Sequence, residues 1–290
     1  MKASLSRIAY DSTMAFSPGQ RPGYTAPMGT LVFRIALSFV IAGVWIAAAT
    51  LVGERLGSRK AGLIGNLPSN ILISLLFMAL TKGPDYAAAA TAGVPMGMAI
   101  DSIFLAVLIF ALGRGLAAAL GLALAAWAVV ATLAVAVLPP LGYAASLAVF
   151  AAAALSLFFL ADARLGREKV ERKPVPFSWK VMVLRAFFAG TIVAGAVAIA
   201  QVAPPYMTGV LATFPAVLTT TMVILVRSQG VAFARATGKI LILSNVNIIV
   251  YTTCVGLLYP TIGPWLGTLL AFAASVVSVY LVGRLTQRLA

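Results

Sequence analysis

One acidic side chain, Asp101, lies well inside a long apolar run of this sequence, near the middle of Ala92–Leu112. If that run crosses a bilayer, an ionised carboxylate at its centre costs about 2.5–3.5 kcal/mol on insertion scales. We therefore expect Asp101 to be protonated at rest, to bond amides and hydroxyls, or to hold a cation. The position suggests proton or cation coupling. A neutral, structural aspartate bonded to a neighbouring helix is the rival interpretation.

Two prolines, Pro68 and Pro215, interrupt apolar runs at a depth of about 10–14 Å, seven to nine residues from the start of each run. Proline removes a helical hydrogen bond and clashes with the carbonyl four residues back, which frees the oxygens of Ile64 and Leu211. In lipid these groups must find partners or line a cavity. Paired breaks at corresponding positions favour a binding site over a kink satisfied by Ser and Thr. The polar neighbours are Asn66, Ser69, Asn70 and Ser74 in one copy, and Thr213, Thr219, Thr220 and Thr221 in the other.

Amides replace the acid in the region that matches Asp101 in the second half of the chain. Asn245 and Asn247 lie there, together with Ser244, Thr252 and Thr253. Such amides offer binding without charge, although Asn in a membrane helix also joins helices to one another. Gly93, Pro95 and Gly97 further predict an irregular outer end for the helix that carries Asp101.

The residues that most enzymes and metal sites use are scarce in this chain. Histidine is absent and Cys254 is the only cysteine, which excludes His/Cys metal sites, Cys–His nucleophiles and an internal disulfide. Packing is the expected role of Cys254. The serines have no His or Lys base at membrane depth, so hydrolytic catalysis is not expected. We predict no enzyme activity, no metal and no cofactor.

Composition places these residues in a membrane protein. The chain has 290 residues, of which 62% are hydrophobic and only 10% are charged, and a soluble domain of this composition would expose one continuous apolar surface. Nine unbroken apolar runs have close to the roughly 20 residues that a transmembrane helix needs, and the alternation of a lipid-facing barrel is absent. The nine runs are Leu31–Val52, Ala61–Leu80, Ala92–Leu112, Gly115–Leu138, Leu141–Ala161, Val181–Ala203, Tyr206–Val226, Lys239–Tyr259 and Ile262–Gly283.

The net charge of +14 follows membrane topology rather than nucleic-acid binding, because most basic residues fall in connections or at helix ends. Cytoplasmic connections carry surplus Lys and Arg, and anionic lipids attract them. The alternation predicts an outer N-terminus and a cytoplasmic C-terminus, in a prokaryotic inner membrane. The basic connections are Gly53–Lys60, Arg114, Asp162–Lys180 and Arg227–Lys239; Thr81–Thr91 is balanced, and Pro139–Pro140, Pro204–Pro205 and Pro260–Thr261 are neutral.

Residues 1–28 are the exception to this alternation, since Lys2, Arg7 and Arg21 lie on the predicted outer side. The segment has no apolar core, so it is not a signal peptide. We expect a disordered tail. Met28 as the true start is the alternative, and it would remove the conflict.

The sequence also repeats itself. Gly62 and Gly209 lie 147 positions apart, as do Pro68 and Pro215, and Gly83 and Gly230. Four helices (29–138) would form the first repeat, 139–161 a linking helix, 162–180 a basic cytoplasmic loop, and 181–290 the second repeat. Because an odd number of crossings separates equivalent helices, the repeats would be inverted. Chance alignment of apolar runs is the alternative.

Residues 54–81 resemble the opening of the GlpM-like family of small four-helix bacterial inner-membrane proteins. The resemblance rests on a basic, Ser-containing turn at Ser58–Lys60 that leads into a Gly-Leu-rich helix with a Leu67–Pro68 step. It extends to about Leu138 and again across 209–283. It implies a four-helix fold and no substrate. The chain departs from the family in being doubled and in having the linking helix.

The sequence therefore predicts an all-α membrane protein of nine transmembrane helices, in two inverted four-helix repeats joined by one helix. Its expected role is transport of a small solute or ion through a site between the repeats, with lipid as its other partner. The alternatives are a channel of the antiparallel four-helix type and a non-transporting scaffold or assembly factor. The predicted site residues are Asp101, Asn66, Pro68, Asn70, Thr213, Pro215, Thr219, Asn245 and Asn247.

Overall fold

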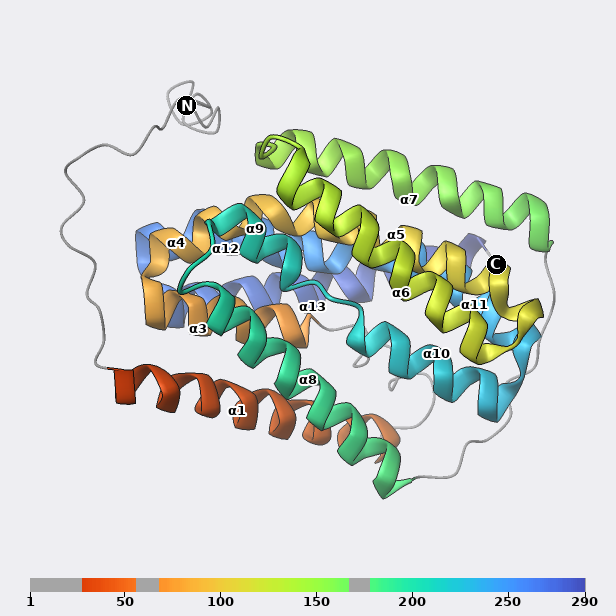
Figure 1. Ribbon diagram of the computed structural model, residues 1–290, viewed down its shortest axis with the longest axis horizontal. Helices are drawn as coiled ribbons and strands as arrows, with labels where there is room; N and C mark the ends of the chain where they lie inside the picture. Colours follow the sequence, from red (N-terminus) through yellow and green to blue (C-terminus); the bar gives the residue numbers. More distant parts are fainter. Residues whose placement is uncertain (1–27, 56–67, 167–177, 290) are drawn as a thin grey trace.

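The structure, a computed structural model, describes residues 28–55, 68–166 and 178–289, and every regular element in these ranges is a helix (Figure 1). The predicted tail falls outside them, except for its last residue. In chain order the elements are α1 (Met28–Arg55), α3 (Ser69–Lys82), α4 (Pro84–Ala90), η1 (Thr91–Gly93), α5 (Val94–Ala111), η2 (Leu112–Arg114), α6 (Leu116–Thr132), η3 (Leu133–Val137), α7 (Tyr143–Leu165), α8 (Trp179–Ile199), α9 (Pro205–Leu211), α10 (Ala216–Gln229), α11 (Val231–Ser244), α12 (Val246–Ile262) and α13 (Pro264–Leu289).

Eight helical stretches of the described chain are long and apolar enough to cross a membrane, which confirms a multi-pass, all-α membrane protein. The ninth predicted run, Ala61–Leu80, is described only from Pro68 onward. Its helix α3 has 14 residues, fewer than the roughly 20 that span a bilayer. The expected nine spans therefore correspond to eight long stretches and the shorter α3.

Single glycines make the turns that the sequence analysis had assigned to longer connections. Gly83 joins α3 to α4 with φ 100°, and Gly230 joins α10 to α11 with φ 91°. Glycine adopts these dihedrals without a Cβ clash, so one residue suffices to turn the chain. The predicted connections Thr81–Thr91 and Arg227–Lys239 are therefore wrong: the residues on either side of each glycine are helical.

The turn before the last helix also lies at a glycine. Helix α12 continues through Pro260 to Ile262, and the turn is at Gly263, with φ 80°. The predicted connection Pro260–Thr261 thus lies before the observed turn, within the last residues of α12. A proline near the end of a helix removes only one hydrogen bond, so it need not end the helix where it stands.

Helix α5 lies at the centre of the bundle, and most of its side chains are buried. It packs against α6, α7, α9 and α11, while α1 packs along α8. The outer faces of α1, α6, α7, α8 and α13 expose large apolar residues, among them Phe33, Val129, Phe159, Trp179 and Trp265. These faces suit contact with lipid acyl chains, so the membrane takes the place of water as their solvent.

Glycines bring two pairs of helices into backbone contact. A Cβ on Gly209 of α9 would lie 1.9 Å from the Ala90 carbonyl oxygen, and one on Gly93 of η1 would lie 2.1 Å from the Tyr206 oxygen. On the other side of the bundle, a Cβ on Gly190 of α8 would lie 2.7 Å from the oxygen of Phe39 on α1. Small residues allow such close approach between membrane helices.

Two helices, α3 and α10, match one another closely. Each has 14 residues, and both their first and their last residues lie 147 positions apart. Pro68 precedes α3 with φ −76° and ψ 49°, and Pro215 precedes α10 with φ −78° and ψ 43°. In Figure 1 the two helices run from the middle of the molecule toward opposite ends.

Candidate functional site

The carboxyl group of Asp101 lies in the interior of the bundle. Its residue is 3% exposed, and the indole Nε1–H of Trp127 donates a hydrogen bond of 3.0 Å to Oδ1. Trp127 belongs to α6, which follows α5 after the turn at Gly115 and packs back against it. Within the described ranges no Lys or Arg pairs with this carboxyl group. Asp101 is thus buried against one neutral donor.

The chain breaks between α9 and α10, at the second predicted proline. Helix α9 ends at Leu211 and α10 begins at Ala216, directly after Pro215. The backbone N–H of Phe214 donates to the Leu211 carbonyl (3.2 Å), and Thr213 Oγ1 donates to the Val210 carbonyl (2.7 Å). The expectation of a free Leu211 oxygen is therefore wrong, because a tighter turn of the backbone supplies its donor.

This break rests on the helices that hold Asp101. The rings of Trp127 and Phe214 meet edge to face, with centroids 4.9 Å apart and planes at 78°. A Cβ on Gly97 would lie 2.2 Å from Thr213 Oγ1, and Gly97 lies one turn before Asp101 on the same face of α5. We call Gly97, Asp101, Trp127, Thr213 and Phe214 the acid–break cluster. The cluster joins Asp101, in the first half of the chain, to the α9–α10 break in the second half.

The first predicted break is described from one side only, because Ile64 and Asn66 lie outside the described residues. Pro68 is buried, and its carbonyl accepts from the Leu72 N–H at 2.9 Å as α3 begins. Further along α3, Asn70 Oδ1 and Ser74 Oγ are buried atoms with no hydrogen-bond partner among the described residues. They lie one turn apart on one face of the helix.

Helix α10 carries the matching polar residues. The N–H of Thr219 donates to the Pro215 carbonyl (2.8 Å), while Thr219 Oγ1 is buried with no partner in the described part of the chain. Thr220 donates to the Val217 carbonyl at 3.0 Å. Thr221 differs, since its Oγ1 accepts from Arg185 (3.1 Å). Both α10 and α3 therefore carry buried polar atoms that have no hydrogen-bond partner among the described residues.

The two predicted amides lie where α11 passes into α12. Asn245 is 7% exposed and Asn247 is 5% exposed. Ser275 of α13 donates to the Asn247 carbonyl at 3.2 Å, and Asn245 Nδ2 has no partner among the described residues. This interhelical hydrogen bond joins Asn247 to α13, whereas the hydrogen bond to Asp101 comes from Trp127.

Sequence analysis overlooked two arginines inside apolar helices. Arg34 of α1 donates to the Leu80 carbonyl at 2.5 Å, and Arg185 of α8 donates to Thr221 Oγ1. Both are partly buried. Their positions, a few residues into the first and sixth apolar runs, were the available signal. Trp127 was missed as well, because no local pattern links it to an acid 26 residues earlier.

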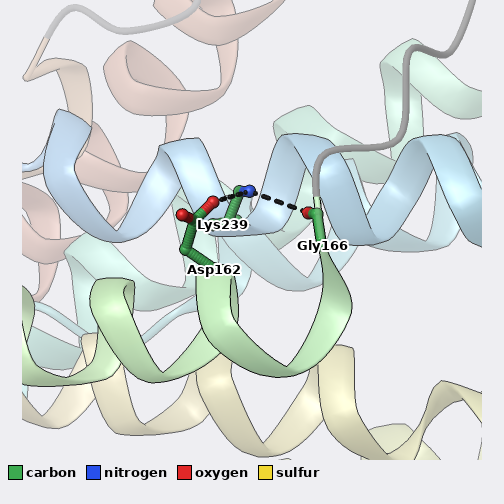
Figure 2. A network of polar contacts seen from close by, with 3 residues as sticks. All are labelled: Asp162, Gly166 and Lys239. Atoms are coloured by element: carbon green, nitrogen blue, oxygen red, sulfur yellow. Dashed lines mark hydrogen bonds and ion pairs between the residues drawn. The ribbon is translucent and has the colours of Figure 1, made fainter.

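A second polar contact joins α7 to α11. Figure 2 shows Lys239 of α11 with its Nζ 2.6 Å from Asp162 Oδ1 and 3.2 Å from the Gly166 carbonyl, at the C-terminal end of α7. A cation is favourable at this end of a helix. The contact fixes α7 to α11, and it lies apart from the acid–break cluster.

Two surface hollows are described, and both lie on outer faces rather than between the halves. Trp179, Val183, Leu184 and Phe187 line one of them on α8, together with Lys180. The other lies on α6 and η3 at Ala128, Val129, Thr132 and Leu133. Neither includes a residue of the acid–break cluster.

Comparisons with protein-family models, with curated proteins and with solved structures find no match to this chain.

Proposed function

We propose that this protein is a membrane transporter that moves a small solute through a site between two inverted halves, with Asp101 as its coupling group. The observation that carries the proposal is the burial of Asp101 beside the α9–α10 break. A carboxyl group at membrane depth is costly, and such groups mark substrate or proton pathways. Broken helices near the midplane are where transporters bind their substrates.

Matched packing supports the inversion of the two halves. By the 147-residue offset, α4 corresponds to the start of α11 and α5 chiefly to α12. Helix α4 packs against α12 and α11 against α5, which is the exchange that a two-fold relation requires. The same relation fits the first and last residues of α3 and α10, which lie 147 positions apart. It also fits the turns at Gly83 and Gly230.

Buried polar atoms support a passage for a polar species. Among the described residues, Asn70 Oδ1, Ser74 Oγ, Thr219 Oγ1 and Asn245 Nδ2 have no hydrogen-bond partner. Each such group costs about 1–3 kcal/mol when it stays unpaired. A solute or water that reaches these atoms in another conformation would recover that energy. This favours a protein that changes state over a rigid one.

The charges support an orientation in a prokaryotic inner membrane. Arg114, Arg164 and Arg227 belong to the last turns of η2, α7 and α10, and these helices end at the right of Figure 1. By the rule that places surplus cations in the cytoplasm, this end faces inward. A GlpM-like unit for each half remains part of the proposal.

Transport is tested with purified protein in liposomes that contain a pH-sensitive dye. A panel of small solutes is applied under an imposed pH gradient, and solute-dependent proton movement is recorded. We expect wild type to respond to at least one solute class and Asp101→Asn to lose the response, because an amide does not exchange a proton. Asp85→Asn, which changes an exposed acid at a helix start, is the matched control and should retain it. A fully active Asp101→Asn variant would refute coupling through this residue.

The close contacts at Gly93 and Gly209 favour one alternative, a non-transporting scaffold, because they fill the space beside the break with backbone. The liposome assay separates the two functions. A scaffold shows no solute flux in either direction. A channel shows solute flux down the gradient, and in Asp101→Asn this flux stays uncoupled from proton movement. Uphill accumulation of a solute under a pH gradient would exclude both.

A further inference from the structure

We propose that Trp127 is the positioning residue that links protonation of Asp101 to the α9–α10 break, and that the coupling ion is therefore a proton. The inference rests on the proposed function, in which Asp101 is the coupling group. It adds the identity of the ion and the residue through which the ion acts.

The chemistry around the carboxyl group favours a proton over a metal cation. The contact on Oδ1 is an N–H donor, which repels a cation approaching the same oxygen. A hard cation takes several oxygen ligands at once, and the described residues contain no group of three or more His, Cys, Asp or Glu side chains that could hold a metal ion. A proton needs one carboxyl oxygen, and Asp101 supplies two.

Taking up a proton changes the strength of the contact with Trp127. A hydrogen bond to an ionised acceptor is roughly twice as strong as one to a neutral acceptor. The ionised carboxylate therefore accepts a strong hydrogen bond from the indole N–H, and the protonated carboxyl group accepts a weaker one. The proton comes from water on the side to which the site is open and returns to water on the other side. No other bond is made or broken.

The indole passes this change to the break through Phe214. Their rings are in edge-to-face contact, and the Phe214 backbone N–H closes the last turn of α9 on the Leu211 carbonyl. A shift of Trp127 thus acts on the residue that holds the end of α9. The contact between Gly97 and Thr213 keeps the break against α5, one turn from Asp101.

Other ionisable groups on the elements around α5 have contacts of their own. Arg235 donates to the Ile109 carbonyl, about 12 Å along α5 from Asp101. Lys239 pairs with Asp162, and the hydroxyls of Tyr259 and Thr268 bond each other. Tyr206 of α9 is also ionisable and is 9% exposed. Helix α6 has no ionisable side chain. The remaining ionisable groups on these elements are Arg114, Tyr143, Arg164, Tyr251 and Cys254.

The test is a pH titration of intrinsic tryptophan fluorescence on the full-length purified protein, which needs no knowledge of the solute. We expect wild type to show a reversible change in emission as Asp101 ionises. Trp127→Phe keeps an aromatic ring but lacks the N–H, so it should lose that change, and Asp101→Asn should lose it while all four tryptophans remain. Trp179→Phe, at a side chain that is 62% exposed, is the control that should retain it. A titration that survives in Trp127→Phe or in Asp101→Asn overturns the proposal.

A second measurement asks whether the change reaches the break. Hydrogen exchange of the backbone amides at 212–217 is compared at one pH between wild type and Asp101→Asn, and again in a Trp127→Phe background. We expect Asp101→Asn to alter exchange only where Trp127 is present. An equal effect in both backgrounds would show that Trp127 does not transmit the change. This comparison stays informative when Trp127→Phe lowers stability, because both members of the pair carry it.

The two proposals fail in different ways. If fluorescence titrates as expected but liposomes show no proton-coupled flux, transport is wrong and the link between Asp101 and Trp127 stands. If flux is present and the titration persists in Trp127→Phe, transport stands and the link is wrong.

Discussion

The segments that follow Gly83 and Gly230 have similar backbones and different chemistry. After Gly83 the chain forms α4, η1 and α5, and places Asp101 against Trp127. After Gly230 it forms α11 and α12, and places Asn245 and Asn247 in the equivalent region. Both segments begin at a glycine turn, whereas the buried acid belongs to the first segment. Two segments with a similar glycine turn can therefore differ in whether they bury an acid.

The irregular positions also differ between these segments. The first has its 3₁₀ turn at Thr91–Gly93, seven residues after the glycine-led helix begins. The second runs for 14 residues before its irregularity at Asn245. Gly93 explains the early turn, because it lies against the backbone of α9 and leaves no room for a side chain. The difference thus arises from what each segment packs against.

The largest effect is expected where the two halves touch through Gly209. In Gly209→Val the new Cβ would lie 1.9 Å from the Ala90 carbonyl oxygen, so the helices must separate. We expect loss of monodisperse protein on size-exclusion chromatography. Gly195→Val, at a glycine with nothing within 4 Å, should be recovered at wild-type yield. Equal yields would show that the crossing of α9 and η1 is not essential to the fold.

A second acid would test why charge occurs in one half only. Asn247 is 5% exposed, and Asn247→Asp places another carboxyl group at membrane depth. We expect a loss of about 2.5–3.5 kcal/mol if that group is ionised, seen as a lower thermal unfolding midpoint at high pH than at low pH. Asp101→Asn should show no such pH-dependent loss. Unchanged stability of Asn247→Asp at high pH would mean that the second half tolerates charge.

The shared turns should respond alike to substitution. Gly83→Ala and Gly230→Ala each force a side chain into a backbone with φ near 100° or 91°. We expect each to cost about 1–3 kcal/mol, with the two costs equal within error, as measured by thermal unfolding of the purified variants. A large cost at one glycine only would weaken the equivalence of the halves.

The smallest effect is expected at the link between α7 and α11, which has no counterpart in the first half. Lys239→Met removes a pair whose side chains are 12% and 31% exposed. Partly exposed pairs contribute up to about 1 kcal/mol, so we expect a lowering of the unfolding midpoint by a few degrees, less at high salt. Asp162→Asn should lower it by a similar amount. A cost several times larger would show that α7 depends on this pair for its docking.

Local chemistry explains what the sequence predicted correctly. Unbroken apolar runs predict helices because lipid offers the backbone no hydrogen-bond partners. Pro215 coincides with the observed break, since it removes a donor at the point where α10 must begin. Gly83 and Gly230, which the sequence offset aligns, are both turns in the structure, but the charged residues beside them were taken for loops. A single glycine turns the chain, so those charges lie on helices.

Contacts between distant segments explain what the sequence could not predict. Trp127 lies on the helix after Asp101, and Phe214 is 87 residues further along the chain than Trp127; only the packed fold brings them together. The partner of the Leu211 carbonyl was equally hidden, because it depends on how tightly the chain turns at Phe214. Arg34 and Arg185 were overlooked for a simpler reason. Basic residues were assigned to connections and helix ends, whereas these two lie inside helices.

The length of two helical stretches bears on the membrane in which this protein works. Pro84–Arg114 has 31 residues and Val231–Ile262 has 32, which correspond to about 45–50 Å of helix, against about 30 Å of hydrocarbon in a typical bilayer. Tilting, and bending at η1 and Asn245, reconcile the two lengths. Bilayer thickness therefore sets the angle between α4 and α5 and between α11 and α12. In bilayers of increasing acyl length, we expect stability to pass through a maximum.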